Sequence, residues 1–145
     1  MPEQFESKDV YPYGTNLQLW LSGQIGNGGA GFLGNDTRTG PLEVPSISFG
    51  ILVVLIRKAK ADQSADLEPW RPRGFLTKEQ IHREMAQLGV ESDCDYVVKY
   101  IYRVREILDE VLGPGWGHRL LEYRKPFGYR LSTPPENLFL NFDCR

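Results

Sequence analysis

Residues 96–112, YVVKYIYRVREILDEVL, place apolar side chains at steps of four and three positions. At about 100° per residue, these steps form one continuous stripe along an α-helix. The stripe consists of Val97, Ile101, Val104, Leu108 and Val111. The opposite face carries Asp95, Lys99, Tyr102, Arg103 and Glu106. We therefore expect a helix that packs on a core through one face, with Ser92 and Asp95 forming a capping box at its start.

Two earlier segments also predict helices. In residues 76–89, LTKEQIHREMAQLG, Thr77 is an N-cap, Gln80 has capping-box spacing and Gly89 is a stop. The apolar face of this helix consists of Ile81, Met85 and Leu88. Residues 46–61, SISFGILVVLIRKAKA, begin at a candidate Ser46 cap and end in basic side chains, which favours a helix. Their β-branched residues leave a strand open as the alternative.

A β-hairpin is expected downstream of the third helix. GPGWG at residues 113–117 ends that helix, and the hairpin is expected between Arg119 and Ser132. Its turn is expected around Lys125–Gly128, because Pro126 lacks the N–H that a paired strand position requires.

Strand alternation assigns directions to the side chains of this hairpin. Tyr129 and Leu131 are expected to face the core, because alternate residues of a strand share a face. Arg124, Lys125 and Arg130 are then expected in solvent, where they form a cationic tip.

The N-terminal third predicts a small antiparallel sheet. Residues 17–25, LQLWLSGQI, alternate apolar and polar side chains as a half-buried strand does. A short strand around Phe32 and Leu33 is allowed, and the stretch that begins PLEVP at residue 41 is read as another extended piece. Gly26, Gly28 and Gly31 match the spacing of a dinucleotide-binding loop, but the glycines and Pro41 that follow exclude the helix such a site needs. We therefore expect a hairpin loop there and no cofactor.

The charge of the chain is unevenly distributed. The 145 residues carry a formal net charge of −2, which is unusual for a chain-wide polyanion binder. Residues 96–131 nevertheless hold seven Lys and Arg against four acidic residues. One segment of the chain is therefore basic, and it coincides with the third helix and the hairpin.

Three stretches resemble the OmpR/PhoB-type DNA-binding domain of bacterial response regulators. They are FLTKEQI at 75–81, YIYRVREIL at 100–108 and LLEYRKPFGYRL at 120–131, the last containing the Gly-Tyr-Arg triplet that ends the wing in this family. The resemblance covers about residues 42–132 and implies an α+β fold. The implied fold is a winged helix-turn-helix with an N-terminal antiparallel β-sheet, three helices and a C-terminal β-hairpin wing. The chain has no room for a receiver domain, so the resemblance is to a stand-alone effector domain.

The resemblance also implies roles for individual residues. Family arginines of the recognition helix correspond to Arg103 and Arg105, the basic wing residue to Lys125, and an early phosphate contact to Lys78. Three positions depart from the family pattern, namely Ala86, Val98 and Tyr100, so a different target sequence is expected. Together with the polar face of the third helix, the full set of expected DNA-binding residues is Lys78, Val98, Lys99, Tyr102, Arg103, Arg105, Glu106, Arg124, Lys125 and Arg130.

The expected function is sequence-specific binding of duplex DNA by a transcriptional regulator, with the third helix in the major groove and the wing on the phosphate backbone. The alternative is a winged-helix module for protein contact in a transcription or DNA-processing complex, where RNA polymerase or another subunit would be the partner. A homodimer stays open. We expect one domain at residues 16–132, a loosely ordered segment at 1–15 and a tail at 133–145.

Other function classes find little support in the sequence. Cys94 and Cys144 with His82 and His118 lack metal-ligand spacing, and no nucleophile–base pair is recognisable, so neither a metal nor an enzyme is expected. No apolar run reaches the roughly 20 residues that span a bilayer. Two free thiols without an export signal fit the cytoplasm.

Overall fold

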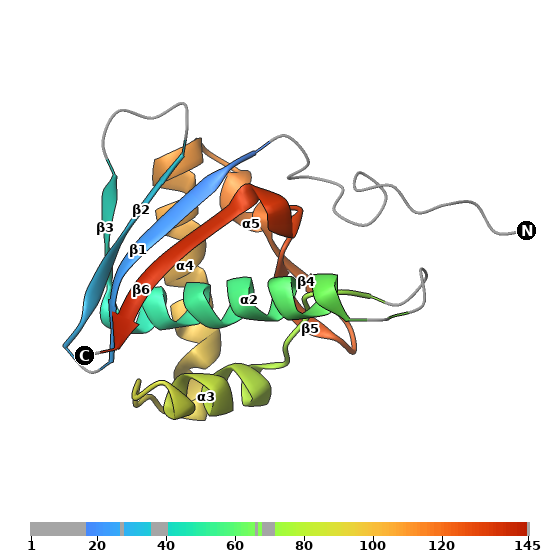
Figure 1. Cartoon of the computed structure of the whole chain (residues 1–145), viewed down its shortest axis with the longest axis horizontal. Coiled ribbons are helices and arrows are strands. Elements are labelled where there is room, and N and C mark those ends of the chain that lie inside the picture. Colours follow the sequence, from blue (N-terminus) through green and yellow to red (C-terminus); the bar gives the residue numbers. More distant parts are fainter. Residues whose placement is uncertain (1–16, 27, 36–40, 66, 68–71, 145) are drawn as a thin grey trace, which may run out of the picture.

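The computed structural model describes residues 17–26, 28–35, 41–65, 67 and 72–144, and these form an α+β structure with a mixed sheet and four helices (Figure 1). The elements, in chain order, are β1 (Leu19–Ile25), β2 (Ala30–Asn35), β3 (Leu42–Pro45), α2 (Ser46–Ser64), α3 (Lys78–Gln87), the 3₁₀ turn η1 (Cys94–Tyr96), α4 (Val97–Leu112), α5 (Trp116–Leu120), β4 (Leu121–Arg124), β5 (Gly128–Leu131), the 3₁₀ turn η2 (Pro135–Asn137) and β6 (Leu138–Cys144). The expected segment at 1–15 lies outside the described residues.

The larger sheet has the strand order β3-β2-β1-β6. The N-terminal strands β1, β2 and β3 pair antiparallel, as expected, but β6 adds to β1 in the parallel direction, so the sheet as a whole is mixed. The predicted tail at 133–145 is corrected, because it contains η2 and the edge strand β6. The physical reason is alternation: Leu138 is buried and Leu140 half-buried, whereas Phe139 between them is exposed, as in a strand with one covered face.

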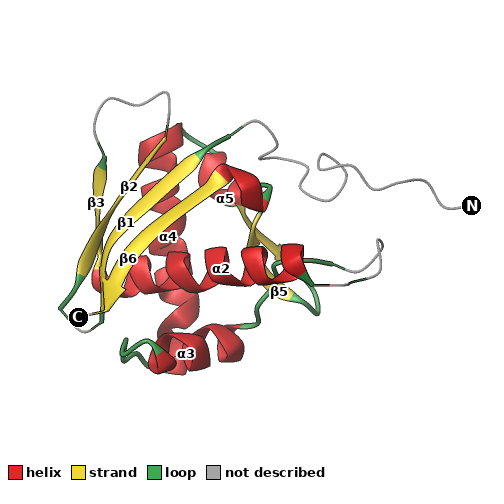
Figure 2. Ribbon diagram, in the orientation of Figure 1, coloured by secondary structure: helices red, strands yellow, loops and turns green. Residues whose placement is uncertain are grey.

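Helix α2 forms the centre of the core. An unbroken run from Ser48 to Ile56 is buried, because the sheet covers one side of this helix and α3 and α4 pack on others. Figure 2 shows α2 running from the β3 end of the sheet towards the small hairpin. The sequence prediction of a helix here is confirmed, but Pro45 occupies the N-cap and Ser46 is the first helical residue.

Helices α3 and α4 largely follow their sequence patterns. The capping box of Thr77 and Gln80 is present, and all five residues of the predicted α4 stripe are buried. The start of α4 differs from the prediction. The Asp93 side chain accepts a hydrogen bond from the Asp95 N–H and caps η1, and α4 begins after it at Val97. The short helix α5 was not predicted.

The hairpin of β4 and β5 is confirmed, with residues 125–127 in its turn. A third segment joins it, since the Leu76 and Tyr129 backbones exchange hydrogen bonds of 2.8 and 2.7 Å. Gly128 is required at the junction because its φ is +103° and a Cβ there would collide with the Leu76 carbonyl. The hairpin is therefore fastened to the residues that lead into α3.

Candidate functional site

Arg105 connects α4 to the hairpin. Its Nε and one terminal nitrogen (Nη2) donate hydrogen bonds of 3.2 and 2.8 Å to the Leu121 carbonyl at the start of β4. Burial lowers the pKa of this guanidinium. Because both bonds go to backbone within the same chain, Arg105 positions the hairpin beside α4. This structural role explains the arginine without the expected DNA contact.

Tyrosines gather where α4 and the hairpin meet. The rings of Tyr123 and Tyr129 lie 4.9 Å apart across the two strands. Burial raises the pKa of Tyr129, Arg105 opposes this shift, and Tyr123 and Tyr102 add to it. Tyr102 and Tyr123 remain 57% and 52% exposed. The junction therefore presents two phenol rings to solvent.

The outer face of α4 is polar and accessible, as its sequence predicts. Lys99, Arg103 and Glu106 are exposed. Arg103 and Glu106 approach to 3.9 Å, and the Lys99 ammonium lies 5.8 Å from the centre of the Tyr96 ring. Exposed pairs of this kind contribute about 0–1 kcal/mol, so a ligand can displace them at little cost.

Arg130 is buried, and its expected place in solvent is wrong. Its guanidinium lies in the interior at 1% exposure, where Nε donates to Glu122 Oε1 at 2.8 Å and Nη1 to the Arg73 carbonyl at 3.0 Å. The centre of the guanidinium also lies 4.6 Å from the centre of the Phe75 ring. The hairpin is covered on both faces near its base, so strand alternation does not leave either face to solvent.

The two basic residues at the tip have different surroundings. Arg124 donates to Glu122 Oε2 at 2.6 Å and its guanidinium lies 5.2 Å from the Phe75 ring, although its side chain stays partly exposed. Lys125 is exposed in the turn. Of the three hairpin cations assigned to DNA, Arg124 and Lys125 reach the surface, whereas Arg130 is buried and cannot contact a ligand.

The remaining predicted positions lie at the starts of helices. Lys78 is the first residue of α3 and is half-buried, and Val98 is half-buried in the first turn of α4. Sequence reasoning missed Tyr123 and Phe127, the exposed aromatics of the hairpin. Strand alternation could not reveal them, because Tyr123 lies opposite Tyr129 on the face expected to be buried and Phe127 lies in the turn.

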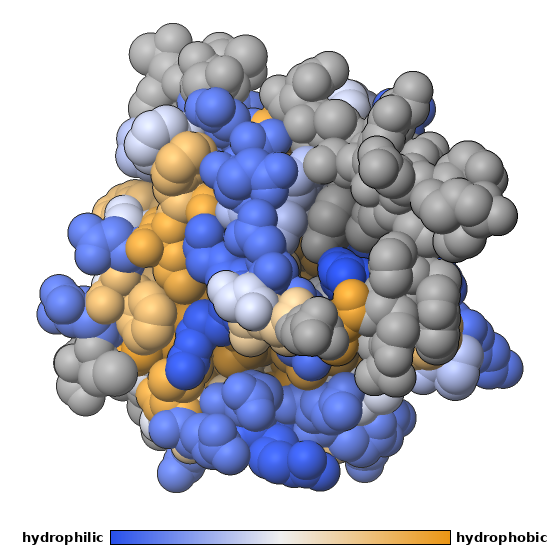
Figure 3. All heavy atoms as spheres, turned by 45° about the vertical axis from the view of Figure 1, so that its right-hand side comes forward, coloured by the Kyte–Doolittle hydropathy of each residue, from blue (hydrophilic) through white to orange (hydrophobic). Residues whose placement is uncertain are grey.

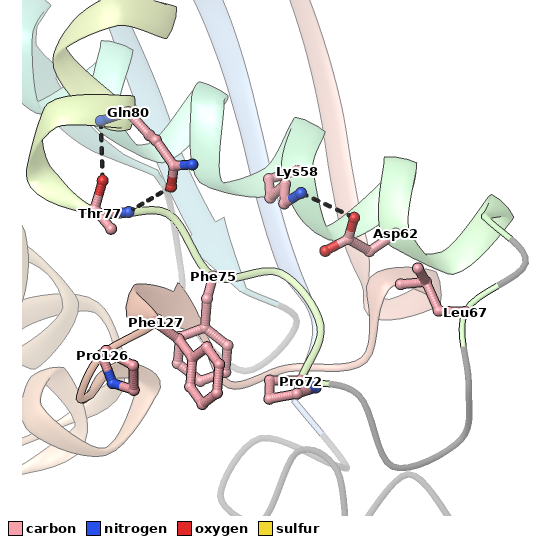
Figure 4. A pocket seen from close by; sticks show the side chains of 9 residues that line it. All are labelled: Lys58, Asp62, Leu67, Pro72, Phe75, Thr77, Gln80, Pro126 and Phe127. Atoms are coloured by element: carbon pink, nitrogen blue, oxygen red, sulfur yellow. Dashed lines mark hydrogen bonds and ion pairs between the residues drawn. The ribbon is translucent and has the colours of Figure 1, made fainter.

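A hollow of about 490 Å³ lies where α2, the start of α3 and the hairpin tip meet (Figure 4). Phe75 and Phe127 both line it and pack against each other, with ring centres 5.9 Å apart. On its α2 side, Lys58 and Asp62 approach to 3.1 Å, and Asp62 also accepts the Gly74 N–H at 2.7 Å. The Asp62 carboxylate therefore has its partners within the chain.

The described residues contain no group of three or more His, Cys, Asp or Glu side chains that could hold a metal ion. Within the same residues, no helix combines the length and the apolar character needed to cross a bilayer. No protein-family model, no curated protein and no solved structure matches the chain.

Proposed function

We propose that the chain is a winged-helix module that binds duplex DNA as a cytoplasmic transcriptional regulator. In this arrangement α3 and α4 form the helix-turn-helix, α4 enters the major groove and the hairpin is the wing. The observation that carries the proposal is the accessible polar face of α4 beside a hairpin with a basic turn. The two Arg105 hydrogen bonds to Leu121 support it, because they hold helix and hairpin together as one surface.

The side chains suit two kinds of DNA contact. Arg103 and Lys99 are exposed on α4, where a guanidinium can bind guanine O6 and N7 and an ammonium can bind phosphate. Lys125 is exposed at the turn and suits a phosphate contact. Glu106 on the same helix face disfavours phosphate and would accept from a cytosine amino group. The surface therefore fits sequence reading better than tight non-specific binding.

A second candidate is a protein-contact module built on the same surface. Tyr102, Tyr123 and Phe127 are exposed large side chains, and aromatic residues are enriched in protein interfaces. The internal use of Arg130 and Arg105 also removes two cations that DNA binding would otherwise recruit.

Selection of bound duplexes from a random pool tests the DNA proposal directly. An enriched motif should emerge, and Arg103→Ala should weaken binding to it by about 1–3 kcal/mol and relax the preference at one position. The control is Arg57→Ala, an exposed arginine on α2. No enrichment, or no loss with Arg103→Ala, would leave the protein-contact module as the better explanation.

A further inference from the structure

The two edges of the larger sheet are protected very differently. Strand β3 has four residues, with Pro41 just before it and Pro45 as its last residue. Strand β6 has seven residues, LFLNFDC, without proline, lysine or arginine. It pairs with β1 on one side, and no described strand pairs with the other. Natural sheets usually blunt an edge by shortness, proline or lysine, because an open row of N–H and C=O groups pairs with other strands. Strand β6 has none of these devices.

Apolar side chains accompany this open edge on both faces of the sheet. On the outer face Phe139 is 38% exposed and stacks on Trp20, which is 48% exposed, with ring centres 4.4 Å apart. On the inner face Leu140 and Phe142 contact the core but are only partly buried. Apolar atoms reach the surface on the side of the molecule where the sheet lies (Figure 3). A partner strand at this edge would cover apolar surface above and below itself.

Lys60 of α2 lies close to the strand but does not guard its open edge. A hollow of about 530 Å³ along β1 and β6 is bordered by Lys60 of α2. The Lys60 ammonium donates to the Pro135 carbonyl at 3.2 Å, and Gln63 on the same helix donates to Glu136 at 3.1 Å. Both bonds tether η2 to α2 and so hold the start of β6 in place. The Lys60 ammonium is therefore engaged with η2 at the start of the strand.

We propose that a second copy of this chain pairs with β6 through its own β6, antiparallel and about a twofold axis. Such pairing is self-complementary, since the same strand supplies donors and acceptors to both copies. Directly opposite residues of an antiparallel pair lie on the same face of the sheet. The twofold axis must therefore lie midway between one residue and the same residue of the other copy. With Asn141 on the axis, Asp143 of each copy faces Phe139 of the other, and the two carboxylates stay apart. The result is one sheet, twice as wide, with the stacked Trp20 and Phe139 of each copy on its outer face.

The extent of the contact indicates a weak affinity. Stable interfaces bury about 800 Å² per partner. One pair of strands meets here, Phe139 and Phe142 are already partly covered by the fold, and Trp20 lies on the inner strand β1, so the contact stays below that size. The dimer should therefore form and dissociate with concentration. This inference is independent of the proposed function.

Sedimentation equilibrium over two orders of magnitude in concentration tests it. The mass should rise from 16.6 kDa towards twice that value. Asn141→Lys, exposed on β6, should raise the dissociation constant at least about tenfold, because two lysines then meet near the axis. Hydrogen exchange of the full chain should slow at the β6 amides as concentration rises.

Two matched variants locate the contact. Ser22→Lys lies directly beside Asn141 on β1, in the middle of the outer face, and Glu43→Lys lies on the opposite edge strand β3. Both positions are exposed, and both variants should dimerise like the wild type. Dissociation by Ser22→Lys but not by Asn141→Lys would indicate face-to-face packing and overturn the proposal. A wild-type chain that stays at 16.6 kDa throughout would also overturn it, whichever segment then covers the edge.

Discussion

Arg130 and Glu122 lie directly opposite each other in the hairpin and form an ion pair of 2.8 Å in which the arginine is fully enclosed. The same arginine donates to the Arg73 carbonyl, 57 positions earlier in the chain. One side chain thus joins β5, β4 and the segment before α3. A residue expected on the DNA surface is part of the framework that holds the hairpin.

Replacing Arg130 should therefore destabilise the fold. Arg130→Ala leaves the Arg73 carbonyl without this donor and Glu122 without its buried partner, and the free energy of unfolding should fall by about 3–5 kcal/mol. Urea denaturation measures this. Arg124→Ala is the control, because it removes an ion pair to the same Glu122 from a partly exposed position and should cost less than about 1 kcal/mol. Equal losses of unfolding free energy for the two variants would show that the burial of Arg130 does not strengthen its contribution to stability.

The α3 capping box makes a separate prediction. Thr77 accepts the Gln80 N–H at 3.2 Å and donates its own N–H to the Gln80 side chain at 2.9 Å. Thr77→Ala should lower the free energy of unfolding by about 1 kcal/mol, whereas Thr77→Ser should retain most of it, since serine keeps the hydroxyl. Both values come from urea titrations. A serine variant as unstable as the alanine variant would argue against the cap.

Alkaline pH should reveal the environment of Tyr129. Its pKa in the folded chain is raised by burial above the ordinary 10.0. Below pH 10.0 both states keep the proton and the effect on stability is absent. As the pH rises through the ordinary pKa towards the raised one, the unfolded chain ionises first, so stability falls. Tyr129→Phe should lose less stability over that interval than the wild type, and parallel slopes in urea titrations at rising pH would contradict the assignment.

The hairpin tip makes a prediction about salt dependence. If Lys125 contacts phosphate, Lys125→Ala should flatten the slope of log affinity against log salt by about one, on specific and random duplexes alike. Adding Arg124→Ala should flatten it by less than about one more, because Arg124 must first leave Glu122. Fluorescence anisotropy over a salt series measures both. An unchanged slope in the double variant would favour the protein-contact module.

Local patterns explain why much of the fold was predictable. The α4 stripe, the Thr77 box and the hairpin turn depend on residues within a few positions of each other, and all three are present. The polar face of α4 followed from the same periodicity. Helix α5 was missed because Gly117 within it and Pro114 and Gly115 before it suggest only a turn.

The sequence by itself determined the three longer helices α2, α3 and α4, the turn of the hairpin and the apolar face of α4, because those properties arise from periodicity and from caps close in sequence. Tertiary structure alone decided that β6 lies parallel to β1, that Arg130 is enclosed and that Arg105 binds backbone. The physical reason is that a strand or a cation acquires its role from its neighbours in space. The partners of Arg130 come from β4 and from the segment before α3, and periodicity within one segment carries no information about them.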